Sequence, residues 1–397
     1  MKPQEFDVYV RHETTRRALL QRAGAAVLTL GAGSPLLAAC GGVAKQASGG
    51  GGAQQAIGGP LDFLSWEGYD LPGPTRAWRR ANHVTFRSTY IGTHDDIQAK
   101  LKSGASTSYD LITYYQGFYD LYKKLDIITP LDESRIPNLK GVDPCFKTSD
   151  TAKRFWVVDG KRYAVPFTWG STTLDYLPDK VDPPESWLDL LKPKFKGKVG
   201  CVPDPSGAFT LGGRILGFDV PNYTKSEFQE IAKLLRRMRA QTRSFAPSFG
   251  DLTNQFVGGQ IGASFAGWAA VGSFAKAKGL TVKSIVPKEG SYSFCDSFAI
   301  PPTTDNRDTV LGWINDALSP KVQARSAESL SAGVVVPAAA PLLSKDTKAI
   351  YPDAYTGDMA AHFTKVPLYG FPPTNGEGGI VTRDQWLKEW SAIQAGH

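Results

Sequence analysis

Short apolar runs with strand character alternate with runs of helical spacing after residue 61. The sequence predicts strands at residues 84–90 and 109–113, and helices near residues 96–101 and 119–125. Strands that alternate with helices indicate an α/β fold. Ligands of such folds bind in loops at the carboxyl ends of the strands. The aromatic residues predicted in these loops are Trp66, Tyr114, Tyr115 and Trp169.

Helical spacing also marks residues 226–239, after a capping signal at Ser226. The recurring apolar residues are Phe228, Ile231, Leu235 and Met238. The basic residues are Lys233, Arg236, Arg237 and Arg239. We interpret the basic side chains as the solvated face of a helix and expect no nucleic-acid partner, because no nucleic-acid-binding motif accompanies them.

The first 39 residues carry the pattern of an export signal peptide. Arg16 and Arg17 precede an uncharged stretch of apolar and small residues, 23–39. The paired arginines, followed by Leu19, fit a twin-arginine signal, which addresses a chain that folds before it crosses the membrane. A spanning helix needs about 20 mostly apolar residues. Because polar residues, glycines and a proline interrupt this stretch, we expect no permanent transmembrane helix.

Residues 37–41, Leu-Ala-Ala-Cys-Gly, resemble the lipobox of bacterial lipoproteins. In this interpretation Cys40 is lipidated and anchors the mature protein to the membrane, since each buried methylene of an acyl chain contributes about 0.8 kcal/mol. The alternative, a buried or spare cysteine, is disfavoured by the preceding signal and the following linker. Residues 41–59 are mainly Gly, Ala, Ser and Gln, so we expect residues 40–60 to form the anchor and a flexible tether.

The length of the remaining chain bears on its organisation. Roughly 340 residues exceed the size at which a single core stops growing, so two lobes are expected. The cysteines in this part are Cys145, Cys201 and Cys295. Their odd number leaves one disulfide possible between partners that the sequence does not decide, and their spacing is not that of a metal site.

Catalytic and metal-binding motifs are poorly represented. His94 with Asp95 and Asp96 comes nearest to a metal cluster, but adjacent residues of one element point to different sides, so we interpret this group as a solvated helix start. Residues 262–266 nearly match the hydrolase nucleophile elbow but have alanine in place of the last glycine. The sequence therefore predicts a protein that is not an enzyme and has no metal or cofactor.

Several blocks of sequence resemble the spermidine/putrescine-binding proteins of ABC importers. The blocks are residues 61–73, 109–112, 166–172, 259–301 and 351–354. The resemblance is strongest in 259–301, where Val-Pro-Lys-Glu-Gly leads to Phe-Cys-Asp-Ser at residues 294–297. It implies a type II periplasmic-binding-protein fold, in which a hinge of crossing strands joins two α/β lobes that close on a ligand in the cleft between them.

This resemblance also implies the boundaries of the lobes. Residues 61–166 and 296–340 would form the first lobe, and residues 167–295 and 341–397 the second.

The resemblance further implies that aromatic rings and a carboxylate hold the ligand. Trp66 and Tyr69 of one lobe and Trp268 of the other would be the stacking walls, and Asp296 would hold an amine. A polyamine suits such a site, because its methylenes pack on aromatic faces and its ammonium groups gain cation-π contacts of about 0.5–2 kcal/mol. Phe294 stands where the family often has another tryptophan. The other candidate ligand-binding residues are Glu67, Tyr115, Trp169 and Asp204.

Two departures from the family pattern bear on the substrate. Asp204 matches one family acid, but the acid expected three residues later is Gly207. Tyr115 and Gly117 stand where the family has a serine and a tyrosine. Glu67 is a hypothesis for the missing charge, because the family usually has a neutral residue there. We therefore predict a cation-binding cleft with a different end-group geometry.

The sequence thus predicts a monomeric, exported, lipid-anchored receptor that captures a small cation, a polyamine, for the permease subunits of an ABC importer. Three alternatives stay open. The solute could be anionic or neutral, with Arg214 at a predicted helix start as its contact. The scaffold could serve an enzyme that uses Glu67, Asp204 or Asp296. The protein could also be a sensor that presents its closed form to a membrane partner.

Overall fold

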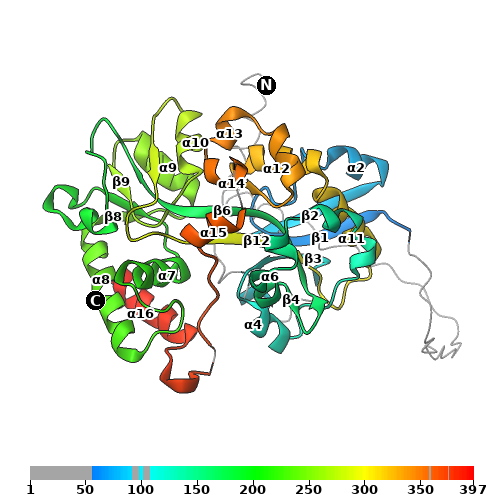
Figure 1. Ribbon diagram of the computed structural model, residues 1–397, viewed down its shortest axis with the longest axis horizontal. Coiled ribbons are helices and arrows are strands. Elements are labelled where there is room, and N and C mark those ends of the chain that lie inside the picture. The colour runs from blue at the N-terminus through cyan, green and yellow to red at the C-terminus, as the bar shows by residue number, and fades with distance from the viewer. Residues whose placement is uncertain (1–55, 92–96, 98, 102–107, 357–358, 374) are drawn as a thin grey trace, which may run out of the picture. The chain divides into compact units, whose positions relative to one another are not determined.

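A large sheet with helices around it makes up the part of the chain that the structure describes (Figure 1). The computed structural model describes residues 56–91, 97, 99–101, 108–356, 359–373 and 375–397. The predictions that lie outside these residues are the export signal with Arg16 and Arg17, the lipidation of Cys40, most of the tether, most of the helix near 96–101, and the group of His94, Asp95 and Asp96.

Parallel strands form one end of a large sheet. β1 (Gly59–Ser65) pairs in parallel with β2 (Val84–Tyr90) and with β3 (Leu111–Tyr115). β12 (Ser293–Ala299) joins β3 in the antiparallel direction, and β6 (Ala164–Tyr176) joins β12. Parallel strands are normally covered on both faces. Accordingly, every residue of β3 except the last is buried.

Further short strands extend the sheet beyond β12. β7 (Val199–Cys201) pairs in parallel with β8 (Thr242–Phe245) and with β9. The strands that pair with β6, besides β12, are β9 (Ala263–Ser264), β10 (Gly267–Trp268), β11 (Lys283–Ile285) and β13 (Gly333–Val334). A separate hairpin pairs β4 (Val157–Val158) with β5 (Lys161–Arg162).

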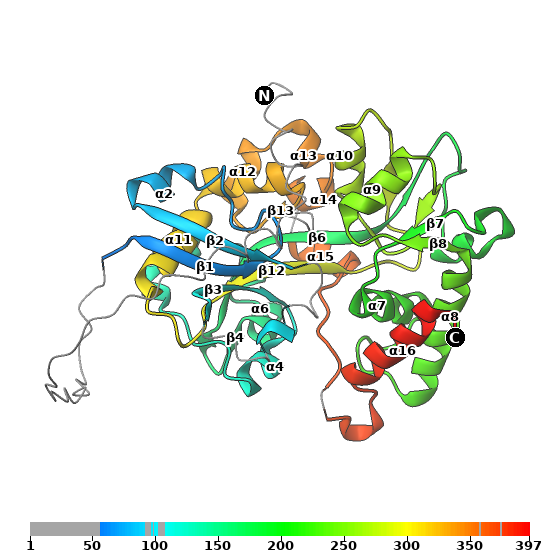
Figure 2. The same cartoon turned by 180° about the vertical axis from the view of Figure 1, so that it is seen from behind.

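Helices surround this sheet (Figures 1 and 2). The α-helices are α2 (Arg76–Ala81), α4 (Tyr119–Lys124), α5 (Pro144–Lys147), α6 (Asp150–Phe155), α7 (Pro205–Leu216), α8 (Lys225–Gln241), α9 (Phe249–Val257), α10 (Val271–Lys276), α11 (Arg307–Ala317), α12 (Pro320–Leu330), α13 (Lys345–Lys348), α14 (Pro352–Thr356), α15 (Met359–Lys365) and α16 (Arg383–Ala395). The short 3₁₀ helices are η3 (Glu133–Arg135), η4 (Pro137–Gly141), η5 (Trp187–Leu191), η6 (Pro193–Phe195), η7 (Pro337–Leu342) and η8 (Glu377–Gly379).

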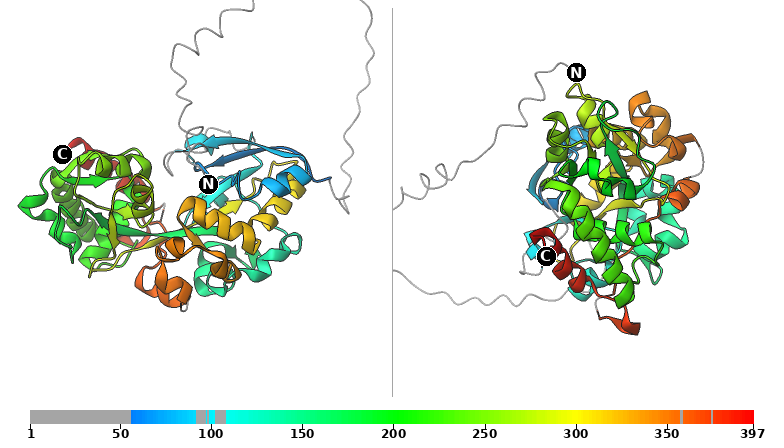
Figure 3. Two further views of the ribbon diagram at one scale, coloured as in Figure 1. Left: turned by 90° about the horizontal axis from the view of Figure 1, so that it is seen from above. Right: turned by 90° about the vertical axis from the view of Figure 1, so that its left-hand side faces the viewer.

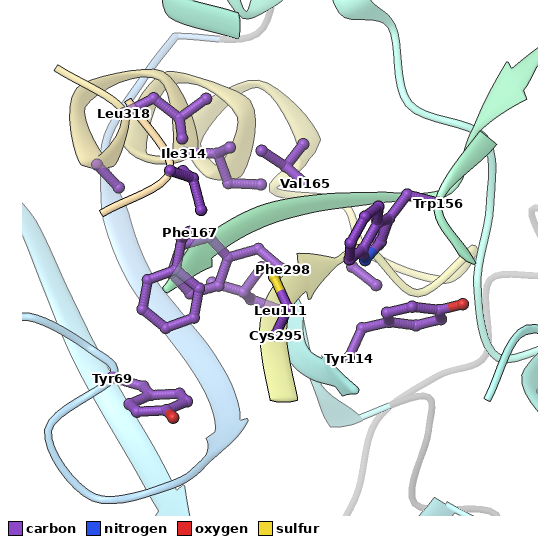
Figure 4. Packing of buried hydrophobic residues seen from close by; sticks show 14 of the residues in the cluster. Tyr69, Leu111, Tyr114, Trp156, Val165, Phe167, Cys295, Phe298, Ile314 and Leu318 are labelled. Carbon is purple, nitrogen blue, oxygen red and sulfur yellow. The ribbon is translucent and has the colours of Figure 1, made fainter. Parts of the chain in front are cut away.

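β6 and β12 connect the two main hydrophobic clusters. All residues of β6 are buried; Phe167 and Trp169 pack in the first cluster, whereas Leu174 and Tyr176 pack in the second. β12 runs antiparallel beside β6 over the same stretch, as Figures 1, 2 and 3 show. The close view of the first cluster includes Phe167 together with Cys295 and Phe298 of β12 (Figure 4). The two strands therefore pass from one core to the other near residues 170–173 and 292–294.

The C-terminal segment contributes to both cores. Tyr351 and Phe363 belong to the first cluster, whereas Trp386 and Trp390 of α16 belong to the second. The sequence assigned residues 341–397 to the second lobe as a whole. The boundaries of the lobes stay a prediction.

The predicted strand positions hold to within two residues. β2 matches the prediction, and α4 matches the helix expected near residues 119–125. The strand predicted at 109–113 instead begins at Leu111, because the Asp110 carboxylate accepts hydrogen bonds from the Asp62 N–H and from Thr304 in a loop. The shift places Tyr115 inside the strand, at its carboxyl end.

Helix α8 begins before the predicted signal. Thr224 is the N-cap, and its capping box with Glu227 satisfies backbone N–H groups of the first turn, so Ser226 lies within the helix and does not cap it. Arg236 and Arg237 are exposed, and Arg236 forms an ion pair of 2.7 Å with Glu389. The interpretation of the basic residues as a solvated helix face is confirmed for Lys233, Arg236 and Arg237, whereas Arg239 is half-buried and lies over the Phe245 ring.

Candidate ligand-binding site

Asp296 is a buried carboxylate with one unfilled hydrogen-bonding position. It lies in β12 and is 3% exposed. The Tyr69 hydroxyl donates to its Oδ2 at 2.7 Å, whereas its Oδ1 has no hydrogen-bond partner among the described residues. Burial raises the pKa of Asp296 to about 7, and the hydrogen bond from Tyr69 opposes that shift. A buried, ionised carboxylate in this state is stabilised by a cation.

The loop after β1 positions Tyr69. The Tyr69 N–H donates to the Trp66 carbonyl at 3.3 Å, and Gly68 supplies the positive φ of 86° that this turn needs. The Tyr69 ring packs edge-on against Phe167, with ring centroids 4.9 Å apart; Figure 4 labels both residues. In this position the Tyr69 hydroxyl reaches Asp296. The same loop leaves Trp66 half-buried and Glu67 exposed. Tyr69 is therefore buried as a donor to the carboxylate, where the sequence predicted a stacking wall.

Trp268 and Phe294 form an aromatic pair above Gly170. Their ring centroids are 5.9 Å apart, and both side chains are half-buried. A Cβ at residue 170 would lie 2.6 Å from the Trp268 Nε1 and 2.5 Å from the Phe294 Cζ, so only glycine fits there. The Trp268 Nε1 donates to the hydroxyl of Tyr351 at 3.3 Å. Two residues predicted from the sequence are thus brought together over the crossing strand.

Trp169 lies on the opposite face of β6 from this pair. Neighbouring strand residues point to opposite faces, and Trp169 is fully buried on the face where its Nε1 donates to the Val334 carbonyl at 2.9 Å. Its ring packs against Tyr351, with centroids 4.6 Å apart. The ring is a core residue without an exposed surface in this structure, and the predicted role of Trp169 in ligand binding stays a prediction.

Tyr115 lies next to Asp296. The two residues are Cα partners in the pairing of β3 with β12. The Tyr115 ring packs against Phe371, with centroids 5.5 Å apart, and remains half-buried. Burial raises the pKa of its hydroxyl well above the ordinary value, and the negative charges of Asp204 and Asp296 raise it further. Tyr115 is therefore next to one predicted carboxylate, Asp296, and within electrostatic influence of a second, Asp204.

Asp204 is the N-cap of α7. Its Oδ1 accepts from the Ser206 N–H at 3.1 Å and its Oδ2 from the Gly207 N–H at 3.0 Å, while Pro205 occupies the first helical position. This cap holds the carboxylate at the positive end of the helix. Arg214, which the sequence placed at a helix start, lies in the last turn of α7. That prediction is wrong because the helix begins earlier, at the Asp204 cap.

Gly117 and Gly207, the two departures from the family pattern, are both sites of close packing. Gly117 has a φ of 92°, and a Cβ there would lie 2.8 Å from the Cα of Gly370. A Cβ at Gly207 would lie 2.5 Å from the Tyr292 hydroxyl oxygen. Neither position has room for a side chain.

Sequence reasoning assigned no site role to Tyr292 or Tyr351. Tyr351 lies in a block that matched the family, and this block was its only signal. Tyr292, Phe294 and Asp296 alternate along the chain, so a strand would place them on one face. Applied from Asp296 backwards, that alternation would have found Tyr292.

The remaining chemistry of the described residues is sparse. They contain no group of three His, Cys, Asp or Glu side chains placed to hold a metal ion. Their three cysteines, Cys145, Cys201 and Cys295, are buried and form no disulfide with one another. None of their helices combines the length and apolar character that crossing a membrane requires.

A family comparison decides the class of the protein. Residues 77–356, more than half of the chain, match the model of the family described as bacterial extracellular solute-binding protein. The chain belongs to this family. The prediction of a solute-binding protein is confirmed at that level, and the family is one of binding proteins, not of enzymes.

Curated relatives of this solute-binding protein bear polyamine names. The spermidine/putrescine-binding periplasmic protein of Escherichia coli (strain K12) is 27% identical over 301 residues, which cover 75% of this chain and 84% of the relative. The putrescine-binding periplasmic protein PotF of the same strain is 28% identical over 315 residues, which cover 74% and 83%.

Solved structures confirm the two-lobed type II periplasmic-binding-protein fold. The putative spermidine/putrescine ABC transporter from Listeria monocytogenes is similar with a TM-score of 0.70 and 19% identity, over 85% of this chain and 99% of that one. The Tp0655 (TpPotD) lipoprotein of Treponema pallidum is similar with a TM-score of 0.69 and 19% identity, over 85% and 100%.

Proposed function

We propose that this protein is the lipid-anchored, extracytoplasmic substrate-binding component of an ABC importer. It captures a small organic cation, and a polyamine of the putrescine or spermidine kind is the expected solute. Trp66, Tyr69, Tyr115, Trp268, Phe294, Asp204 and Asp296 are its proposed ligand-binding residues, with Glu67 at the rim.

The unfilled Oδ1 of the buried Asp296 carboxylate carries this proposal. Desolvating a carboxylate is costly unless an opposite charge compensates for it. Tyr69 satisfies only Oδ2. An ammonium group bound at Oδ1 would complete the hydrogen bonds of Asp296 and neutralise its charge.

The aromatic residues around Asp296 support an amine with an aliphatic body. Trp268 and Phe294 keep part of their rings accessible, and Tyr115 lies beside the carboxylate. Aromatic faces bind methylene groups through apolar contact and ammonium groups through cation-π attraction. The polyamine names of the curated relatives agree with this chemistry.

The crossing strands supply the hinge of the proposed receptor. β6 and β12 change from the first core to the second near residues 170–173 and 292–294. Bending there would bring Trp268 towards the loop of Trp66 and Tyr69 and close the site on its solute. The lobe boundaries expected from the sequence place the division at the same crossings.

Export and assembly complete the proposal. The twin-arginine pattern at Arg16 and Arg17 and the lipobox at Cys40 support export of a folded monomer that a lipid anchor holds at the outer face of the membrane. The partner would be the permease subunits of an importer. Genes for a permease and an ATPase beside this one would favour transport over a sensor role.

Calorimetric titration of the purified protein tests the proposed solute. The panel contains putrescine, spermidine, amino acids and sugar phosphates. We expect saturable binding of the polyamines, weakened in Trp268→Ala by about 0.5–2 kcal/mol through loss of the cation-π face. Trp187→Phe, a change of a fully buried tryptophan in the second core, is the matched control. Binding of another class alone would refute the cationic solute and keep the receptor.

A further inference from the structure

Tyr292 shares the face of Asp296 and Phe294. It immediately precedes β12, and its carbonyl accepts a hydrogen bond from the Thr172 N–H of β6 at 2.9 Å. The side chain is 7% exposed and belongs to the second core. Residues two apart along an extended strand point to the same side, so the Tyr292 ring continues the row that Asp296 and Phe294 begin.

The Tyr292 hydroxyl occupies the space beside Gly207. A Cβ at Gly207 would lie 2.5 Å from the Tyr292 hydroxyl oxygen and 2.7 Å from the Asp204 Oδ2. Both distances are shorter than real Cβ contacts, so no side chain can stand at residue 207 while Tyr292 keeps its position. The phenol oxygen and the Asp204 carboxylate are therefore neighbours at the first turn of α7.

The surroundings keep this phenol neutral. Burial raises the pKa of Tyr292, and the charge of Asp204 raises it further, while a hydrogen bond with Thr172 opposes the shift. Tyr115 lies beside Asp296 on the neighbouring strand β3, as its Cα partner. The Tyr292 phenol thus lies beside the Asp204 carboxylate and on the same strand face as Asp296.

We propose that Tyr292 is a specificity-determining residue that closes the space at Gly207 and restricts the site to a diamine, with one ammonium at Asp296 and the other at Asp204. This inference rests on the proposed function. A third ammonium would meet the Tyr292 hydroxyl in place of an anion and would be desolvated without a compensating charge. A monoamine would reach only one of the two carboxylates.

Helix α7 offers a matched control for Tyr292. Tyr223 covers Gly213 of the same helix, where a Cβ would lie 2.0 Å from the Tyr223 hydroxyl oxygen. That hydroxyl donates to the Phe209 carbonyl at 3.0 Å inside the second core. Tyr223 therefore reproduces the packing of a tyrosine over a helix glycine without the two carboxylates.

The experiment compares putrescine, spermidine and butylamine by calorimetric titration of the wild type, Tyr292→Ala, Tyr292→Phe and Tyr223→Phe. We expect the wild type to bind putrescine at least about tenfold more tightly than either other amine. Tyr292→Ala should reduce the preference for putrescine over spermidine by about tenfold. Removing the ring opens a space in which water can solvate the third ammonium of spermidine. Tyr223→Phe should leave the preference unchanged.

Two outcomes overturn the inference. One is a wild-type protein that binds spermidine as tightly as putrescine; the other is a preference that changes by less than about twofold in Tyr292→Ala. Should Tyr292→Ala fail to fold, Tyr292→Phe decides: it keeps the ring but removes the hydroxyl, and it should shift the preference where Tyr223→Phe does not. Absence of any amine binding by the wild type would refute the proposed function instead.

Discussion

Asp175 and Asp296 are buried aspartates on the two crossing strands, and their surroundings differ. Asp175 in β6 is fully buried, and its carboxylate accepts hydrogen bonds from Thr173 at 2.8 Å, Ser264 at 3.0 Å and Ser284 at 2.7 Å. Asp296 in β12 accepts one, from Tyr69. Burial raises the pKa of each carboxyl to about 7.

The comparison separates a structural carboxylate from the carboxylate that we propose binds the ligand. The raised pKa is common to both residues and therefore does not mark a site. Both oxygens of Asp175 are occupied by hydroxyl groups that join β6 to β9 and β11, so the network fixes the second half of the crossing strand. The open Oδ1 of Asp296 is the feature that calls for an external cation.

The largest expected effect that tests this contrast is on affinity. Asp296→Asn should weaken polyamine binding by about 2–5 kcal/mol, because a buried charge-assisted contact is lost. Calorimetric titration measures the change. At pH 8 the free energy of unfolding should not fall, because the substitution removes a buried charge. Undiminished affinity would show that Asp296 does not hold the solute.

Asp175→Asn should lower the stability of the protein and leave its affinity for polyamines nearly unchanged. An amide cannot accept hydrogen bonds at both of its terminal atoms, so one of the three hydroxyl groups loses its acceptor, and we expect a loss of about 1–3 kcal/mol in the free energy of unfolding. Denaturant titration measures it. Polyamine affinity should stay within about twofold of the wild type. Equal losses of affinity in Asp175→Asn and Asp296→Asn would break the comparison.

The pH dependence of binding follows from Asp296. A cation needs the ionised carboxylate, so with a pKa of about 7 the affinity should rise about tenfold between pH 6 and pH 8. Titration across this range should show the rise in the wild type and in Asp175→Asn and its loss in Asp296→Asn. An equal rise in Asp296→Asn would assign it to another group.

The free energy of unfolding of the ligand-free protein should fall as the pH rises, whereas the affinity for the solute rises. Both aspartates have folded pKa values of about 7, above the value of about 3.9 in an unfolded chain, so the folded protein binds more protons between these limits. Stability should therefore fall as the pH rises from about 4 to about 7. Denaturant titrations should show a shallower fall in either Asp→Asn variant; an unchanged slope in both would contradict the raised pKa values.

Tyr69→Phe should have the smallest effect. It removes the one hydrogen bond to Asp296, which contributes about 0.5–1.5 kcal/mol to stability. Because that hydrogen bond lowers the pKa of Asp296, the pH profile of binding should move to higher pH. Tyr122→Phe in the same core is the control. A profile that does not move would show that the hydroxyl of Tyr69 leaves the carboxylate when the ligand binds.

The alternation of strands and helices could be predicted from the local spacing of apolar residues. β2 and α4 are short local elements, and their residues already carry the necessary spacing. The starts of β3 and α8 were displaced because the side chains of Asp110 and Thr224 make hydrogen bonds that apolar spacing does not reveal. The two-lobed fold itself required the family resemblance, since β6 and β12 lie far apart in the chain.

Residues of the candidate site could be predicted from the sequence only where the family resemblance pointed to them. Asp296, Tyr69 and Trp268 were found in this way, and the structure places Trp268 over the crossing strand and Tyr69 at Asp296. The core position of Trp169 could not be predicted, because the pairing of β6 with strands remote in sequence decides which residues face the core. Its role in ligand binding stays a prediction. Asp175 was missed because Ser264 and Ser284, which complete its hydrogen bonds, are remote in sequence.

The order of strands in the sheet constrains how the chain can be synthesised and exported. β3 lies between β1 and β12, so its outer edge stays without a partner until residues 293–299 have been made. At roughly 5–20 residues per second the ribosome needs on the order of ten seconds or more for that interval. An exposed strand edge is a template for aggregation, so the nascent chain has a long period in which a chaperone would protect it.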